Sequence, residues 1–339
     1  MTRKTSSEVS IRQVARLAGV SPMTVSRVLS SPGLVAPETL LRVQAIVDSI
    51  GYVPNRVAGS LSSSRSTVVA MIVPSLRNAL YAETMQGMSD VLGRDGFQLM
   101  ISDSGYSLEE EERLIRACIA QRVCGLVLHN TTHTPQAVQM IKSAGIPCVE
   151  TGNLCADPLD MAVSYSNHAA GKAIAEHLAD LGYRHIGFAS LPVSLSDRLR
   201  ERRKGFIAGL RARGLKVDPA LSLEVEPGLE SGARAIAQLL ETGLPLDAVF
   251  FAGDVLGAGA LFECLRRGIA VPSELAVAAS DDNELMRNML PALTTVRFPR
   301  YQIGARSAEL ILDRALNRRP AAGTVREDLG FEVVRRGST

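Results

Sequence analysis

The sequence predicts a small all-α head followed by a larger α/β body of two lobes, each built on a doubly wound parallel sheet. The chain has 339 residues, 46% of them apolar, which is enough to bury two ordinary cores and a smaller one. Apolar residues recur at helical spacing up to about residue 50, and from Val68 short apolar runs alternate with segments of helical period. We therefore expect a head at 1–54, a connecting segment at 55–66 and a body at 67–339.

Charge separates the same two parts. Residues 1–65 contain eight Lys or Arg and three Asp or Glu, whereas the whole chain has 37 basic and 35 acidic residues. A basic head on a faintly acidic body is typical of a protein that contacts the phosphate backbone of nucleic acid, although a basic disordered tail gives the same sum. The pattern within the head has to distinguish these classes.

The first helix of the head is expected at about 11–18. Ser10 and Gln13 have the spacing of a capping box, in which each side chain satisfies a backbone N–H at the helix start. Gly19 ends the helix. The expected apolar stripe consists of Val14, Leu17 and Ala18.

A second and a third helix follow. Ser21 can cap a helix whose first residue is Pro22, because the fixed φ of proline suits that position. The third helix should begin at Pro37 and end at Gly51. The residues expected to face inward are Val25, Val28, Leu29, Leu40, Val43, Ile46, Val47 and Ile50.

Two short helices joined by a tight turn and supported by a third form a helix-turn-helix unit, whose second helix can enter the major groove of DNA. Because packing uses the apolar side chains of that helix, Pro22, Met23 and Arg27 are left to face outward. Nearby hydroxyl groups can contact phosphates, and these belong to Ser21, Thr24 and Ser26. A three-helix module that binds protein is the alternative, which the basic charge disfavours.

The connecting segment Asn55–Thr67 is rich in serine and leaves two interpretations open. It is compatible with a helix as far as Leu61, but Gly59 and the serine run make that helix marginal in isolation. The segment is therefore either a flexible linker or a hinge that becomes helical when a minor groove orders it.

The body alternates strands and helices, which indicates parallel sheets covered by helices on both faces. About 270 residues are too many for one such sheet, so two lobes are expected, with a ligand bound in the cleft between them at the carboxyl ends of the strands. The expected strands are Val68–Val73, Phe97–Ile101, Gly125–Leu128, Pro147–Glu150, His185–Ala189, Ala248–Phe251 and Leu275–Ala278.

The body lacks the motifs of common enzyme classes: there is no G-x-x-x-x-G-K-[ST], G-x-S-x-G or H-E-x-x-H. His129 and His133 are four apart across a strand end and loop and are expected to have no carboxylates nearby, so neither a metal site nor a cofactor is predicted. The acidic run Glu109–Glu112 is expected to be solvated at a helix start. The stretch Gly253–Leu261 has the wrong glycine spacing for dinucleotide binding and should be a strand-to-helix turn that places Asp254 at the cleft.

Cysteine usage and hydropathy indicate a cytoplasmic protein. The five cysteines are odd in number and lie mainly in apolar segments, which suits buried reduced thiols rather than disulfides. Apolar runs such as Val68–Val73 are far shorter than a membrane span, and no export signal is evident.

The basic cluster RLRERRK, Arg198–Lys204, allows three interpretations. Most of its charges are expected on a solvated helix face, and a second DNA-binding patch is disfavoured so far from the head. Arg198 and Arg202 are candidates for an anion clamp, because a guanidinium matches a carboxylate bidentately.

Two stretches, ARLAGVSPMTVSRVL from Ala15 and GYVPNRVA from Gly51, resemble the lactose/galactose-repressor family of bacterial transcription regulators. The resemblance implies a body similar to periplasmic sugar-binding proteins, with several chain crossings, and a homodimer on a near-palindromic operator. It places Pro22, Met23 and Arg27 at base edges, Thr24, Ser26 and Asn55 at phosphates, and Leu61 in the minor groove.

The resemblance also implies effector contacts in the cleft. Arg202 stands three residues before Gly205, as the effector-binding arginine of the family does. Where relatives usually place an aspartate this chain has Gly152, so Glu150 or Asn153 would substitute. The remaining matching or neighbouring positions are Ser75, Asn78, Tyr81, Asp254 and Asp282.

The expected effector is a sugar acid such as gluconate or 2-ketogluconate. The chain has no Trp and 4% aromatic residues, which poorly supplies a stacking site, and its cleft candidates suit a linear hydroxylated anion. The stretch VPSLRNALYAE also looks like the gluconate-type branch of the family. A neutral sugar or purine effector remains open, as do a transport or sensory sugar-binding role, corepression instead of induction, and a tetramer instead of a dimer.

Overall fold

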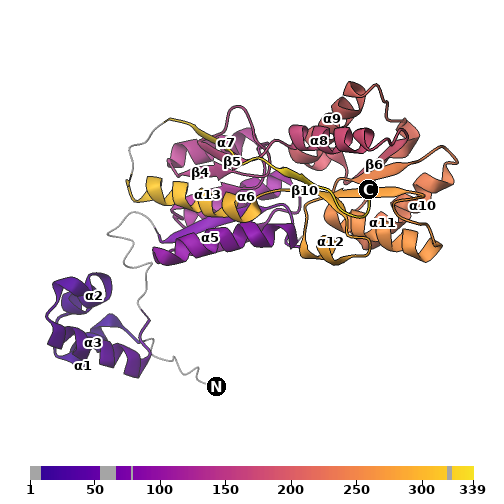
Figure 1. Cartoon of the computed structure of the whole chain (residues 1–339). Coiled ribbons are helices and arrows are strands. Elements are labelled where there is room, and N and C mark those ends of the chain that lie inside the picture. Colours follow the sequence, from indigo (N-terminus) through magenta and orange to yellow (C-terminus); the bar gives the residue numbers. More distant parts are fainter. Residues whose placement is uncertain (1–8, 54–65, 78, 319–322) are drawn as a thin grey trace, which may run out of the picture. The chain divides into compact units, whose positions relative to one another are not determined.

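A computed structural model describes residues 9–53, 66–77, 79–318 and 323–339 (Figure 1). The chain divides into two compact units, one up to Ser66 and one from Thr67. Three candidate site residues, Asn55, Leu61 and Asn78, lie outside the described residues.

The head contains the three expected α-helices, α1 (Ile11–Ala18), α2 (Pro22–Ser30) and α3 (Pro37–Ile50), with a 3₁₀ turn at Pro32–Leu34. The Ser10 hydroxyl accepts a hydrogen bond from the Gln13 N–H at 3.4 Å, and the Ser21 hydroxyl accepts one from the Thr24 N–H at 3.1 Å. Gly19 and Gly51 end their helices at φ +64° and +63°, where glycine avoids the strain of a Cβ. The predicted helix starts and ends are confirmed.

The core of the head corrects one expectation. Leu17 was expected in the apolar stripe of α1, but its side chain is 52% exposed. Ala15 is buried in its place, because α1 packs on α2 and α3 through the face that carries Val14, Ala15 and Ala18.

The body has two sheets of six strands each, as two doubly wound lobes require. The first lobe contains β1 (Val68–Val73), β2 (Gln98–Asp103), β3 (Gly125–Leu128), β4 (Cys148–Glu150), β5 (Met161–Ser164) and β11 (Val325–Asp328). Its order is β11-β5-β4-β3-β1-β2, with parallel neighbours throughout. Its helices are α5 (Ala82–Arg94), α6 (Leu108–Ala120), α7 (Pro135–Ala144) and α13 (Arg300–Ala315).

The second lobe contains β6 (Ile186–Ser190), β7 (Ser222–Glu224), β8 (Ala248–Phe251), β9 (Ala276–Ser280), β10 (Thr294–Arg297) and β12 (Glu332–Val334). Its order is β12-β10-β9-β8-β6-β7, and β12 runs antiparallel to β10, a departure from the expected parallel sheet. Its helices are α8 (Asn167–Asp180), α9 (Asp197–Ala212), α10 (Leu229–Glu241), α11 (Asp254–Arg267) and α12 (Glu284–Asn288).

Helices cover both faces of the first sheet, so the side chains of β1 are buried on both faces. Val69, Met71 and Val73 lie in one apolar cluster with residues of α5 and α13, and Ala70 and Ile72 lie in another with residues of α6 and α7. This arrangement explains why the parallel strand reads as an unbroken apolar run.

The chain crosses between the lobes three times: after β5, between β10 and α13, and between β11 and β12 (Figure 1). The expected strands are found with shifts of one or two residues at several ends, but β5, β7, β10, β11 and β12 were missed. Three of these are short edge strands that bury few side chains, so they lack the apolar run that revealed the others.

The cysteines are free thiols, and Cys155 is half-buried while the other four are buried. Among the described residues, no helix combines the length and hydropathy needed to span a bilayer.

Candidate functional site

The outward face of α2 presents the side chains that the sequence assigned to DNA. Pro22, Ser26 and Arg27 are exposed, and the Met23 side chain is 70% exposed. Thr24 is half-buried, and its hydroxyl lies 2.9 Å from that of Ser21. The inward packing of Val25 and Val28 therefore turns an apolar and a cationic side chain outward together.

The basic cluster on α9 divides by helix face. Arg198 and Arg202, four residues apart, are 8% and 5% exposed, whereas Arg200 and Lys204 are exposed. The solvated-face interpretation holds for Arg200 and Lys204, while the two candidates for an anion clamp lie on the buried face of the same helix.

The guanidinium of Arg202 donates four hydrogen bonds to groups of the protein. Its Nε and Nη2 donate to Asn167 Oδ1 at 3.2 and 2.8 Å. Its Nη1 donates to the Ala252 carbonyl at 3.1 Å and to Ser280 Oγ at 2.7 Å, and lies 3.7 Å from Asp281 Oδ2. Arg202 thereby connects α8 with the carboxyl ends of β8 and β9.

A second guanidinium shares Asp281. Arg300, at the start of α13, donates to the Asp281 carboxylate at 2.5 Å and to the Asp281 carbonyl at 2.7 Å. Burial alone would raise the pKa of Asp281, but the charges of Arg202 and Arg300 outweigh it and hold that pKa below its usual value. We call Arg202, Arg300 and Asp281 the second-lobe charge cluster.

An aromatic ring lies beside this cluster. The guanidinium carbons of Arg202 and Arg300 are 5.3 and 5.5 Å from the centroid of the Phe298 ring. Tyr165 stacks on the same ring with centroids 3.8 Å apart. Cation–π attraction at these distances helps to keep both guanidinium groups in place.

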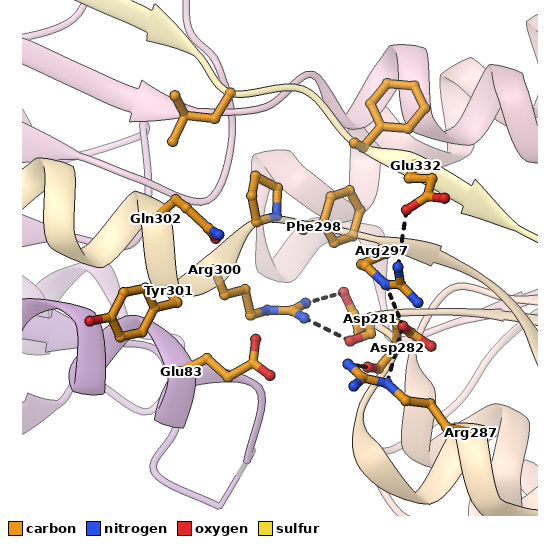
Figure 2. Close-up of a pocket in the computed structure, with 13 residues that line it drawn as sticks. Glu83, Asp281, Asp282, Arg287, Arg297, Phe298, Arg300, Tyr301, Gln302 and Glu332 are labelled. Atoms are coloured by element: carbon orange, nitrogen blue, oxygen red, sulfur yellow. Dashed lines mark hydrogen bonds and ion pairs between the residues drawn. The ribbon is translucent and has the colours of Figure 1, made fainter.

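A pocket of about 530 Å³ lies next to the cluster (Figure 2) and is lined by Asp281, Asp282, Arg300 and residues of α5, α12 and β10, among others. Asp282, a candidate effector ligand, accepts a hydrogen bond from Arg297 Nε at 2.7 Å and pairs with Arg287 and Arg336 at 3.4 and 2.6 Å. Three cations therefore already neutralise its carboxylate.

The first lobe buries a charge cluster of opposite composition. His133 Nδ1 lies 2.5 Å from Glu111 Oε1, and His133 Nε2 lies 3.3 Å from Glu150 Oε1. Burial lowers the pKa of His133, but hydrogen bonds to both glutamates outweigh it and raise the pKa to about 9. We call Glu111, His133 and Glu150 the first-lobe charge cluster.

This cluster corrects two expectations and adds contacts at a third candidate residue. The acidic run was expected to be solvated, but Glu111 is buried, because α6 turns it toward the loop after β3. His133 does have carboxylates beside it, supplied by distant segments. Glu150, which stays a candidate effector ligand, accepts hydrogen bonds from His133 through one oxygen and from the Leu159 N–H through the other.

Polar contacts join the lobes at the start of α9. Asp197 Oδ2 accepts hydrogen bonds from Thr131, which follows β3, and from Asn153 Nδ2 at 3.0 Å. Asn153 Oδ1 accepts from Asn167 Nδ2 at 3.1 Å. These contacts bring together side chains from the carboxyl ends of β3, β4 and β5, as the predicted cleft requires.

Tyr81 lies at this cleft, and its hydroxyl accepts a hydrogen bond from Arg198 Nη1 at 3.4 Å. Its ring is buried edge-on against His129, 4.7 Å between centroids. Burial, followed by the charges of Arg198 and Arg300, lowers the pKa of His129 well below its usual value, so its imidazole is neutral. Ser75 is half-buried, and its hydroxyl accepts from the Arg77 N–H at 3.3 Å.

Asp254 is the first residue of α11 and is buried, as expected for the strand-to-helix turn. It accepts from Asn283 Nδ2 at 2.6 Å and from the Val255 N–H at 2.7 Å. Burial, followed by the charge of Asp281, raises its pKa.

Two buried acceptors of this region were not among the sequence candidates. Asn130 Oδ1 and Asp197 Oδ1 have no hydrogen-bond partner within the described part of the chain. Asn130 follows the end of β3, and Asp197 is the first residue of α9. Polar residues at such places tend to line the cleft of a doubly wound fold, which is the signal that could have identified them from the sequence.

Comparison with known proteins gives two matches to family models. Residues 10–55 match bacterial regulatory proteins of the lacI family, and residues 175–339 match a periplasmic binding protein-like domain. The HTH-type transcriptional regulator GntR of Pseudomonas aeruginosa is 37% identical over 339 residues, which cover 99% of this chain and 97% of the relative.

Solved structures agree. A LacI family transcriptional regulator from Silicibacter pomeroyi is 32% identical, covers 97% of this chain and 99% of its own, and has a TM-score of 0.89. The lac repressor dimer bound to operator and an anti-inducer is 24% identical, covers 97% and 98%, and has a TM-score of 0.84, which shows the shared fold. With a helix-turn-helix head, a two-lobed body and a 37% identical regulator matched over almost its whole length, this protein belongs to the LacI family of bacterial transcriptional regulators.

Proposed function

We propose that this regulator is a homodimeric repressor of sugar-acid utilisation genes, released from its operator in the cytoplasm when a sugar acid binds the interlobe cleft. The observation that carries the choice of effector is the buried guanidinium of Arg198 at the start of α9, one turn before the buried Arg202. Buried guanidinium groups suit a carboxylate ligand, because they recognise it bidentately and without competition from water.

The partnerless acceptors Asn130 Oδ1 and Asp197 Oδ1 support a polyhydroxylated ligand, since each can accept a hydrogen bond from a hydroxyl group. Asn153, Tyr81, Ser75 and Asp254 remain proposed contacts in the same cleft. A neutral sugar would use the same acceptors and leave the arginines without an anion.

A thermal-shift scan tests the effector. Gluconate and 2-ketogluconate are expected to raise the melting temperature, while glucose, ribose and hypoxanthine leave it unchanged, because a ligand specific for the folded state stabilises it by mass action. A rise with a neutral sugar or purine alone would contradict the sugar-acid effector and leave the DNA-binding assignment intact.

For DNA, we propose that α2 reads the major groove with Pro22, Met23 and Arg27, while Ser21, Thr24 and Ser26 contact phosphates. Asn55 and Leu61 remain proposed contacts on resemblance alone. Arg27→Ala is expected to weaken operator binding by roughly 5- to 150-fold, about 1–3 kcal/mol for a lost base contact, without changing the melting temperature. Fluorescence anisotropy on an operator selected from a random library measures it, with the exposed Arg42→Ala on α3 as control.

The homodimer is supported by exposed apolar side chains of the second lobe. Leu265 on α11, Leu285 on α12 and Leu290 just after it are exposed, Leu290 to 91%. Exposed apolar groups of this size suit burial against a second subunit. Sedimentation at micromolar concentration should give a dimer, and Leu290→Asp should shift it toward monomer.

A further inference from the structure

The three arginines buried at the cleft differ in how many of their N–H groups the protein satisfies. A guanidinium has five N–H donors. Arg202 donates to Asn167, Ala252 and Ser280, and Arg300 donates twice to Asp281. Within the described residues, Arg198 makes a single hydrogen bond, the 3.4 Å contact with Tyr81.

Arg198 is nevertheless buried and charged. Its side chain is no more exposed than a core residue, and no carboxylate among the described residues forms an ion pair with it. The neighbouring carboxylate, Asp197, directs one oxygen to Thr131 and Asn153. A buried cation with most donors unused is costly unless something else binds it, so this position indicates an anionic ligand.

The backbone opposite Arg198 explains how the side chain reaches this place. Gly152 has φ +89°, and a Cβ built on it would lie 2.9 Å from Arg198 Cδ and 2.8 Å from His129 Nε2. His129 cannot easily move aside, because its Nδ1 is bonded to Thr151 Oγ1 at 2.9 Å and its ring packs on Tyr81. Any side chain at position 152 would therefore displace Arg198 or strain the backbone.

We infer that Arg198 binds the carboxylate of the effector, that Gly152 provides the space for it, and that Arg202 is a positioning residue which holds the second-lobe edge of the cleft. The inference rests on the proposed sugar-acid effector and assigns its charged group to one residue. A sugar acid and a sugar phosphate both carry an oxyanion on a hydroxylated carbon chain. A sugar phosphate is therefore the alternative ligand that could supply the anion bound by Arg198.

Calorimetry on the full-length protein tests this assignment with three ligands: gluconate, glucitol, which is the same carbon chain without the carboxylate, and glucose 6-phosphate. The variants are Arg198→Gln, Arg198→Lys, and the exposed Arg200→Gln on the same helix as matched control. Arg198→Gln should weaken gluconate binding by about 100-fold, the loss typical of a charge-assisted bidentate contact. Arg198→Lys should retain part of the affinity, and Arg200→Gln all of it.

Stability of the ligand-free protein provides an independent readout. Because the protein satisfies so few of its donors, Arg198→Gln should leave the melting temperature of the ligand-free protein unchanged or raise it. An arginine with a structural role would lower it on removal. Gly152→Ala should weaken gluconate binding as well, because its Cβ displaces the Arg198 stem.

Two results would overturn the assignment: gluconate affinity of Arg198→Gln within threefold of the parent protein, or a marked loss of stability without ligand. Tighter binding of glucose 6-phosphate than gluconate, lost in Arg198→Gln, would keep Arg198 as the anion site and replace the carboxylate by a phosphate. If the parent protein binds glucitol as well as gluconate, the sugar-acid proposal and this inference both fail.

Discussion

The two lobes bury charge clusters of opposite composition. In the first lobe one cation, His133, lies between two carboxylates, those of Glu111 and Glu150. In the second-lobe charge cluster, the guanidinium of Arg202 and that of Arg300, at the start of the first-lobe helix α13, share the carboxylate of Asp281. The first cluster depends on a side chain that titrates within an accessible pH range, whereas the cations of the second never lose their charge. The second-lobe cluster, which carries the excess positive charge, is therefore the one whose cations keep their charge as the pH changes.

Of the predicted changes, removing the carboxylate of Asp281, which Arg202 and Arg300 share, should lower the stability of the protein most. Asp281→Ala leaves two buried guanidinium groups without their counter-charge, and we expect it to lower the free energy of unfolding by about 3–5 kcal/mol. Urea denaturation measures the change, with the exposed Asp157→Ala as control. A loss below about 1 kcal/mol would show that the two arginines do not depend on Asp281.

Between pH 6 and 10, a change of pH should alter the charge of the first-lobe cluster and leave the charges of the second-lobe cluster unchanged. The pKa of His133 is about 9 in the folded protein and 6.5 in the unfolded chain. Its contribution is therefore fully present below pH 6.5 and is lost as the pH rises through 9, a change of about 3 kcal/mol.

The measurement is urea denaturation of the parent protein and of His133→Gln between pH 6 and 10. Buried thiols such as Cys148, whose pKa is raised mainly by burial, also lower stability at high pH in both proteins. The difference between the two curves isolates His133, and it should shrink as the pH rises. A difference that is constant with pH would exclude a charged imidazole.

The smallest effect is expected for a charge pair on the surface. Arg203, on the same helix as Arg202, donates to Glu224 at 2.9 Å, and both side chains are about one-third exposed. Arg203→Ala should change the free energy of unfolding by about 0–1 kcal/mol, because solvent screens an exposed pair. A loss approaching that of Asp281→Ala would contradict the contrast between buried and exposed charges.

The head could be predicted from sequence more completely than the cleft because its signals are local. The caps at Ser10 and Ser21 and the stops at Gly19 and Gly51 each depend on neighbours within a few residues. The error at Leu17 arose because helical spacing alone leaves the exact direction of the buried face uncertain by one position.

The cleft was only partly predictable, since its partners lie far apart in the chain. Arg198 and Arg202 were candidates because a guanidinium matches a carboxylate, and Arg202 also because of the family resemblance. The pairing of His133 with Glu111 and Glu150 joins a loop to α6 and to the end of β4, and Asp281 meets Arg300 across two different elements. No spacing rule in one sequence reveals which distant charges become partners.

The order in which the chain visits the two sheets has a consequence for its synthesis. The last two strands, β11 and β12, complete edges of different sheets, and β12 is followed by Ser338, whose hydroxyl accepts from the Thr294 N–H at 2.8 Å. A chain growing from its N-terminus therefore leaves β5 and β10 each with an unpaired edge until residues 325–334 emerge from the ribosome. The two lobes obtain their last described strands within ten residues of each other, so a chain that stops near residue 320 would lack a strand in both lobes at once.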